Sequence, residues 1–353
     1  MKKYLLLSSI MTLLFLCACS NMKQTGEIQN TPVLTANTAT DEEVTGIDTS
    51  ATGPVTGQVV EPDADTAATP VAGQDADTVA DPAADTEIET EVFVEIPDIH
   101  GIMFDNQGGM FITRKGLGIL KVTPDANVTV FTSLDRLKDK TERTHIYSMA
   151  LGKDNTMYAA ACDRIIKITP DGDMETLIEE DFSGQWGACD VKVDREGNIY
   201  VVHGVKVDRY SGSLKKMPFI DGEKDKVKLS AAVGIDFDKD YKNLYLGDVF
   251  GKKIVKYPLD SADSAREPLG IDLGNKNPEY VTVSECNEAF VSLPGGGGLA
   301  KVGADGEVTV LCEDTLKEPF TLAFGGEGFD EKSLYVVSQG KVYRVKVGCG
   351  GTH

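Results

Sequence analysis

The sequence has 353 residues, of which 41% are hydrophobic, and its 56 acidic residues outnumber its 35 basic residues to give a formal net charge of -21. Nucleic-acid phosphates and anionic lipid head groups repel a chain this acidic, which excludes both as direct partners.

The first residues have the features of a bacterial export signal. Lys2 and Lys3 precede an apolar run over residues 4–16, shorter than the roughly 20 apolar residues that a membrane-spanning helix needs. The run ends in "LCAC" (16–19), which resembles the lipoprotein box Leu-x-Ala/Gly-Cys, whose cysteine is lipidated and becomes the mature N-terminus. An ordinary cleaved signal with two incidental cysteines is the alternative. We interpret residues 1–18 as a lipoprotein signal peptide.

Cys19 is therefore the predicted lipidation site and the predicted contact with a membrane, since each buried acyl methylene adds about 0.8 kcal/mol. Ser20, rather than an aspartate, follows it, and in lipoprotein sorting this favours the outer membrane, on its periplasmic or surface face. The negative charge suits a solvated protein of the cell envelope.

Residues 19–89 are predicted to form a disordered acidic tether. They are rich in Thr, Ala, Asp, Gly and Pro, and no Lys or Arg occurs between Lys23 and Arg114. Such a segment has too little apolar content to offset the entropy of ordering. Asp-x-Asp pairs such as "PDADT" (62–66) suggest calcium, but a calcium loop needs spaced oxygen ligands, a turn glycine and a final carboxylate. A solvated linker is the preferred interpretation.

From residue 90 onward the sequence repeats. An apolar residue followed by an aromatic one recurs at intervals of 42 to 47 residues: Met110-Phe111, Met157-Tyr158, Ile199-Tyr200, Leu244-Tyr245, Ala289-Phe290 and Leu334-Tyr335. Short alternating segments and polar turns surround each pair, which indicates strands. Four strands in about 40–45 residues are typical of a propeller blade, so we predict an all-β, six-bladed β-propeller with four-stranded blades. An open β-array or sandwich is the alternative.

The last repeat lacks an outermost strand. It runs through "SLYVVSQ" (333–339) and "KVYRVKV" (341–347) and stops, whereas "TEVFVEI" (90–96) precedes the first repeat. Pairing this N-terminal strand with the last blade would leave no unpaired sheet edge. We predict a propeller over residues 90–348 closed in this way, then a C-terminal tail over 349–353.

Cysteine usage leaves the disulfide pairing open. The predicted propeller and tail contain an odd number of cysteines, so they cannot all pair internally, and none lies in a Cys-x-x-Cys motif. They are Cys162, Cys189, Cys286, Cys312 and Cys349.

Aligning the repeats on their aromatic pairs gives each blade one residue at the start of its innermost strand, at the mouth of the central channel. These residues are His100, Tyr147, Cys189, Val233, Glu279 and Phe320. Convergent polar groups in a concavity are the default hypothesis for a ligand site. Trp186 is a further candidate for stacking on a ligand, or packs between blades. Asp248 is either a pocket carboxylate or a turn cap.

Three segments resemble the SMP-30/gluconolactonase family. "PFTLAFGGEGFDEKSLYVV" (319–337) is similar to its closing Phe-Gly-Gly…Leu-Tyr-Val motif, "CDVKVDREGNIYVV" (189–202) to its Asn-Asp-Gly-Lys-Val-Asp segment, and "VGIDFDKDYKNLYLGDV" (233–249) to its Asn-Gly-Leu segment. The resemblance covers about residues 91–348, and its repeat motifs are shared loosely with NHL-type propellers. It implies a propeller that binds one divalent cation at the top of the channel and hydrolyses lactones.

The resemblance places the four cation ligands at positions that hold His100, Cys189, Val233 and Glu279 here. Only Glu279 keeps a carboxylate and Val233 has no donor atom, so the oxygen-rich site suited to calcium is lost. His100, Cys189 and Glu279, with His145 and Tyr147 nearby, are ligand types that suit zinc better. Channel lining without metal is the preferred alternative.

Two hypotheses of function follow. The preferred one is a monomeric, lipid-anchored propeller that binds an unknown small molecule or envelope protein. The other is a divergent metal-dependent lactonase or esterase, in which metal held by His100, Cys189 and Glu279 activates water.

Overall fold

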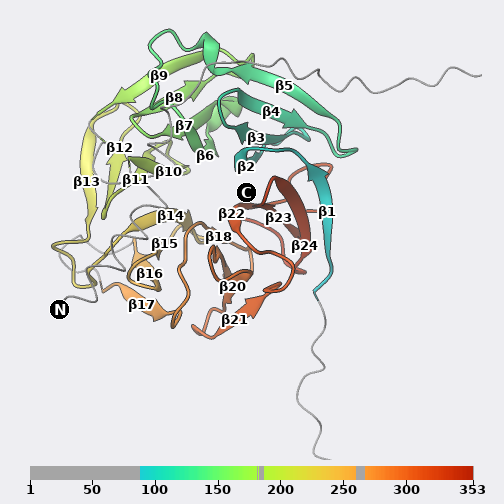
Figure 1. Cartoon of the computed structure of the whole chain (residues 1–353). Coiled ribbons are helices and arrows are strands. Elements are labelled where there is room, and N and C mark those ends of the chain that lie inside the picture. The colour runs from blue at the N-terminus through green and yellow to red at the C-terminus, as the bar shows by residue number, and fades with distance from the viewer. Residues whose placement is uncertain (1–87, 181, 183–186, 260–266, 353) are drawn as a thin grey trace, which may run out of the picture. The chain divides into compact units, whose positions relative to one another are not determined.

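The computed structural model describes residues 88–180, 182, 187–259 and 267–352, and these form six four-stranded antiparallel sheets. Figure 1 shows the sheets arranged around a common centre as the blades of a propeller. The predicted all-β, six-bladed propeller is therefore confirmed. The predicted signal peptide, Cys19, the tether up to residue 87 and Trp186 lie outside the described residues.

Each blade is given from its innermost to its outermost strand. Blade 1 is β2 (Ile99–Phe104), β3 (Met110–Arg114), β4 (Gly118–Val122) and β5 (Val128–Ser133); blade 2 is β6 (Ile146–Leu151), β7 (Met157–Ala161), β8 (Arg164–Ile168) and β9 (Met174–Glu179). Blade 3 is β10 (Ala188–Val193), β11 (Ile199–His203), β12 (Lys206–Tyr210) and β13 (Lys216–Asp221); blade 4 is β14 (Ala232–Phe237), β15 (Asn243–Asp248), β16 (Lys253–Pro258) and β17 (Leu269–Asp272). Blade 5 is β18 (Val281–Val283), β19 (Ala289–Ser292), β20 (Leu299–Val302) and β21 (Val308–Leu311); blade 6 is β22 (Pro319–Phe324), β23 (Ser333–Ser338), β24 (Lys341–Lys346) and β1 (Thr90–Glu95).

In the described ranges, short 3-10 helices over Leu134–Arg136 and Lys153–Asn155 lie between these strands. Among the described residues, no helix is long and apolar enough to cross a membrane.

The repeated aromatic residues lie on the second strand of each blade and pack against the next blade. Tyr200 of β11 meets Phe237 of β14 with ring centroids 5.0 Å apart, and Tyr335 of β23 meets Phe104 of β2 at 5.1 Å. Such edge-to-face pairs add about 0.5–1.5 kcal/mol beyond the burial of their area. The 42-to-47-residue spacing of these aromatic residues therefore corresponds to one interblade contact in each repeat.

The N-terminal strand closes the ring as predicted. β1 pairs antiparallel with β24, from Thr90 opposite Val345 to Glu95 opposite Lys341. Phe93 packs its ring edge-on against Tyr335, with centroids 5.3 Å apart. The outer edge of the last blade is thereby covered by the strand that begins the propeller.

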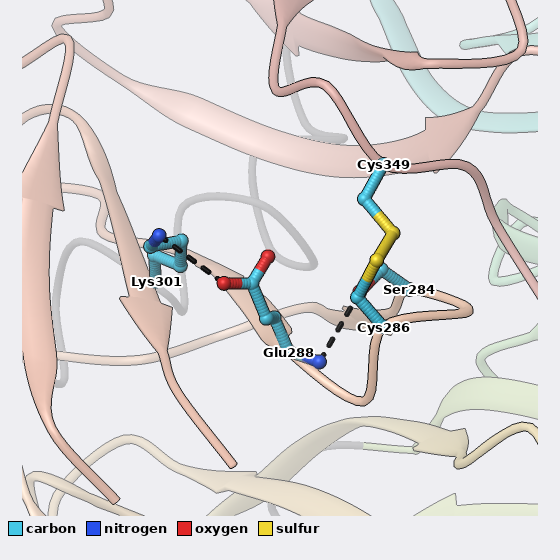
Figure 2. The surroundings of a disulfide bond; sticks show 5 residues. All are labelled: Ser284, Cys286, Glu288, Lys301 and Cys349. Carbon is cyan, nitrogen blue, oxygen red and sulfur yellow. Dashed lines mark hydrogen bonds and ion pairs between the residues drawn. A yellow bond between two sulfur atoms is a disulfide. The ribbon is translucent and has the colours of Figure 1, made fainter. Parts of the chain in front are cut away.

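A disulfide between Cys286 and Cys349 resolves the pairing that the sequence left open. It joins the β18–β19 turn to the C-terminal segment, defined here as residues 347–352, as Figure 2 shows. Gly351 of this segment forms an antiparallel bridge with Ser284, and the amide of Glu285 donates to the carbonyl of Gly350 at 2.8 Å. The other cysteines of the propeller, Cys162, Cys189 and Cys312, are thiols.

Candidate functional site

The six aligned residues lie at one end of the channel. His100, Tyr147, Cys189, Val233 and Phe320 are each the second residue of an innermost strand, and Glu279 lies two residues before β18. The sequence alignment thus places these residues at the same level in the structure.

Aromatic rings pack against one another at this level. The ring centroids of His100 and Phe320 lie 5.3 Å apart, and those of Tyr280 and Phe320 lie 5.0 Å apart. The ring centroid of His145 lies 4.8 Å from that of His100 and 4.7 Å from that of Tyr147. We call these five residues the axial cluster. Their edge-on and tilted contacts place packed rings, rather than a set of convergent oxygen donors, at this end of the channel.

Tyr280 is the member of the axial cluster that sequence reasoning missed. It comes from blade 5, and its hydroxyl donates to the carbonyl of Cys189 on blade 3 at 3.2 Å, so it reaches across blade 4. A signal for it exists in the sequence. At the corresponding position the other blades carry residues with shorter side chains, namely Gly101, Ser148, Asp190, Gly234 and Thr321, so Tyr280 stands out as the long side chain at that position.

Burial favours the neutral form of both histidines. Desolvation lowers the pKa of His100, and Lys115 lowers it further. Desolvation, followed by the charges of His100 and Lys115, lowers the pKa of His145 to about 4. The Nδ1 atom of His100 is buried without a hydrogen-bond partner. Two neutral imidazoles in contact can pack against rings without the repulsion that two imidazolium ions would suffer.

Glu279 is buried in an unusual state. Its exposed fraction is 3%, and its Oε2 atom has no hydrogen-bond partner. Desolvation, with a smaller contribution from the charge of Glu318, raises the pKa of Glu279 to about 8. The side chain is therefore a neutral carboxylic acid at pH 7.

The proposed metal ligands do not come together as a ligand set. Across the described parts of the chain, no group of three or more His, Cys, Asp or Glu side chains lies close enough to hold a metal ion. The thiol of Cys189 donates to the carbonyl of Gly187 at 3.7 Å, and Val233 packs in the same apolar cluster as Cys189. The residues at the channel mouth therefore do not fit the divalent cation that the resemblance implies.

Asp248 has the turn-capping role. It is fully buried, and its Oδ1 atom accepts the amides of Ser230 at 2.9 Å and Ala231 at 2.8 Å, with a longer contact from Gly251 at 3.3 Å. Lys253 lies 3.6 Å from its other oxygen. A carboxylate engaged by these donors holds the loops at the ends of β14 and β15 together.

The chain is similar in sequence to one protein family and in fold to several proteins of known structure. The sequence profile of the SMP-30/Gluconolactonase/LRE-like region matches residues 116–340. A gluconolactonase from Xanthomonas campestris is similar over 73% of this chain and 89% of its own, at 14% identity and a TM-score of 0.60. Regucalcin from Agrobacterium tumefaciens, a calcium-binding protein, is similar over 73% and 92%, at 13% identity and a TM-score of 0.58. Virginiamycin B lyase from Staphylococcus aureus is similar over 74% and 100%, at 13% identity and a TM-score of 0.54. The sequence has no match among curated proteins.

A lactonase, a calcium-binding protein and a lyase thus share this fold at identities that establish the fold alone, and a fold does not determine its chemistry. The profile match is of a different kind, because it is made on the sequence and extends through most of the propeller, from residue 116 to residue 340. The predicted resemblance is confirmed by it: this chain belongs to the SMP-30/gluconolactonase/LRE-like family.

Proposed function

We propose that this protein is a binding module of the SMP-30/gluconolactonase-like family, held at the cell envelope by a lipid on Cys19. The observation that carries the proposal is the composition of the channel mouth. Of the four positions that hold cation ligands in the family, only that of Glu279 keeps a carboxyl group, and this group is a buried neutral acid beside Tyr280. A surface of packed rings suits the recognition of a ligand or partner protein by contact.

The alternative, a divergent metal-dependent lactonase or esterase, draws its support from family membership. Against it stand the donors themselves. A hard cation such as calcium takes about six to eight oxygen ligands. Here Val233 has no donor atom, and ionising Glu279 to make it a ligand costs free energy because it is buried. Zinc would need His100, Cys189 and Glu279 to move together.

Metal and substrate assays separate the two functions. With the purified full-length protein we expect no stoichiometric zinc or calcium binding by calorimetry, and no hydrolysis of gluconolactone above the uncatalysed rate. His100→Ala and Cys189→Ala should leave both measurements unchanged. The alternative would be established instead by lactone turnover together with binding of one zinc ion per chain. The affinity for zinc should then fall tenfold or more in either variant.

The cell-envelope assignment is supported by two features. Leu16-Cys17-Ala18-Cys19 matches the lipoprotein box, and the Cys286–Cys349 disulfide suits an oxidising compartment outside the cytoplasm. The outer membrane is favoured over the inner one by Ser20, and we expect a monomer there.

Fatty-acid labelling tests the anchor. In bacteria grown with an alkyne-tagged fatty acid, the wild-type protein should carry the label and fractionate with membranes. Cys19→Ala should lose both, because the acceptor thiol is gone. Cys17→Ala is the matched control, since it removes the neighbouring cysteine and should keep the label. Equal labelling of wild type and Cys19→Ala would rule out the proposed anchor.

A further inference from the structure

A cavity of about 170 Å³ lies at the other end of the channel from the axial cluster. It is lined by residues of the innermost strands of all six blades, which places it on the propeller axis. Strand β2 runs from Ile99, beside His100, to Phe104, which lines the cavity. The cavity is thus separate from the channel mouth, and what it binds does not depend on the function proposed above.

The wall of the cavity is polar on one side. Lys192, Asp236 and Thr282 occupy the same position on the innermost strands of blades 3, 4 and 5. The Nζ atom of Lys192 lies 3.3 Å from Oδ1 of Asp236. Oδ2 of Asp236 accepts the hydroxyl of Thr282 at 3.1 Å and the amide of Val283 at 2.9 Å. The carboxylate is thereby fixed in place beside the cavity.

The opposite side of the wall is apolar. At the position equivalent to Lys192, blades 1, 2 and 6 carry Met103, Ala150 and Ala323. A molecule in the cavity therefore meets a charged pair on one side and aliphatic groups on the other. Gly351 and Thr352 of the C-terminal segment complete the lining, held there by the disulfide at Cys349.

The charged pair has capacity for further partners. An ammonium group carries three donors, and across the described residues Asp236 is the one ion-pair partner of Lys192. The exposed fractions of the two side chains are 26% and 13%, so both reach the cavity surface. A ligand with both a negative and a positive group can contact Lys192 and Asp236 at the same time, whereas a singly charged ligand can form a charge-assisted contact with only one of them.

We propose that this cavity binds a small α-amino acid with an apolar side chain. Its carboxylate accepts hydrogen bonds from Lys192, its ammonium group donates to Asp236, and its side chain packs toward Met103 and Ala150. Both polar contacts are charge-assisted, which makes them roughly twice as strong as neutral hydrogen bonds. The cavity's volume of about 170 Å³ compares with the roughly 150 Å³ apolar cavity that takes up benzene, so six to eight or so non-hydrogen atoms fit.

Calorimetry on the purified full-length protein tests the proposal, with L-valine as the probe. We expect binding with a dissociation constant of about 1 mM or lower. Isobutyrate lacks the ammonium group and isobutylamine lacks the carboxylate, and each should bind at least about tenfold more weakly because one charge-assisted contact is lost. This comparison needs no variant and so stands even if a substitution impairs folding. Absence of L-valine binding, or equal binding of isobutyrate, would overturn the proposal.

Variants locate the site. Lys192→Met keeps the length of the side chain and removes its charge, and we expect it to weaken L-valine binding about tenfold or more. Thr282→Val should weaken binding less, since it only loosens Asp236. Lys167→Met is the matched control, because Lys167 pairs with Glu175 on blade 2 at 2.9 Å and does not line the cavity. Unchanged affinity in Lys192→Met, or an equal loss in Lys167→Met, would show that L-valine binds elsewhere.

Discussion

Glu279→Gln is expected to stabilise the protein at pH 8 and to remove much of its loss of stability between pH 5 and pH 8. The folded-state pKa of Glu279 is about 8, against an ordinary value of 4.5. Between these values the folded protein holds a proton that the unfolded chain releases. The free energy of unfolding therefore falls as pH rises through this window, by up to about 1.4 kcal/mol per pH unit. Glutamine has nearly the same shape and never ionises, so this penalty disappears.

Urea denaturation at pH 5 and pH 8 measures the effect. At pH 8 the variant should exceed the wild type by on the order of 3 kcal/mol, with a much smaller difference at pH 5. Glu318→Gln is the control: Glu318 is exposed and its charge contributes less than burial to the shift, so it should change stability little. A Glu279→Gln variant that is less stable than wild type at pH 8 would show that the ionised carboxylate is needed, as a metal ligand would be.

Removing the disulfide is expected to lower the free energy of unfolding by roughly 4 kcal/mol. The bond joins residues separated by 63 positions, and the entropy lost by closing a loop of that size in the unfolded chain gives this magnitude. A protein of this size should then melt roughly 10 °C lower. Thermal and urea denaturation of Cys286→Ser/Cys349→Ser, and of wild type with a dithiol reductant, measure the effect.

The control for this experiment is Cys312→Ser. Cys312 is a thiol that lies 3.4 Å from the hydroxyl of Thr90, outside the disulfide, so its replacement by a similar polar group should cost little. The serine pair should also resemble the reduced wild type, because both release the same segment. If the free energy of unfolding fell by less than about 1 kcal/mol in the double-serine variant, hydrogen bonds such as that from Glu285 to Gly350 would be enough to hold the C-terminal segment without the disulfide.

The fold was predictable from local signals, and the details of the site were not. The aromatic pairs recur because each blade repeats one packing contact, so a single sequence displays the pattern six times. The closing strand followed from a count of strands. By contrast, three donor types at one level of the channel do not form a site unless the space between them is open. Tyr280 and Phe320 pack together at that level with ring centroids 5.0 Å apart, and among the described residues the donors there do not gather as a ligand set.

The disulfide shows a second limit of sequence reasoning. Cys286 lies in a turn of blade 5 and Cys349 follows blade 6, and only the curvature of the ring brings the two together. No spacing rule along the chain encodes such a contact. Asp248 is a third case, because a buried carboxylate beside a channel is compatible with binding or with capping. The amides that converge on it decide in favour of capping.

The pairing of β1 with β24 has a consequence for the order in which the propeller folds. Blades 1 to 5 are each built from strands that are neighbours in the sequence, so each can form once its own strands have been synthesised, whereas Thr90 of β1 pairs with Val345, near the end of the chain. Contacts between such distant residues form slowly, because a long loop must close first. Throughout that delay β1 is an exposed strand with unpaired backbone groups, open to proteases and to other chains. Formation of the last blade thus decides when the first strand of the propeller becomes protected.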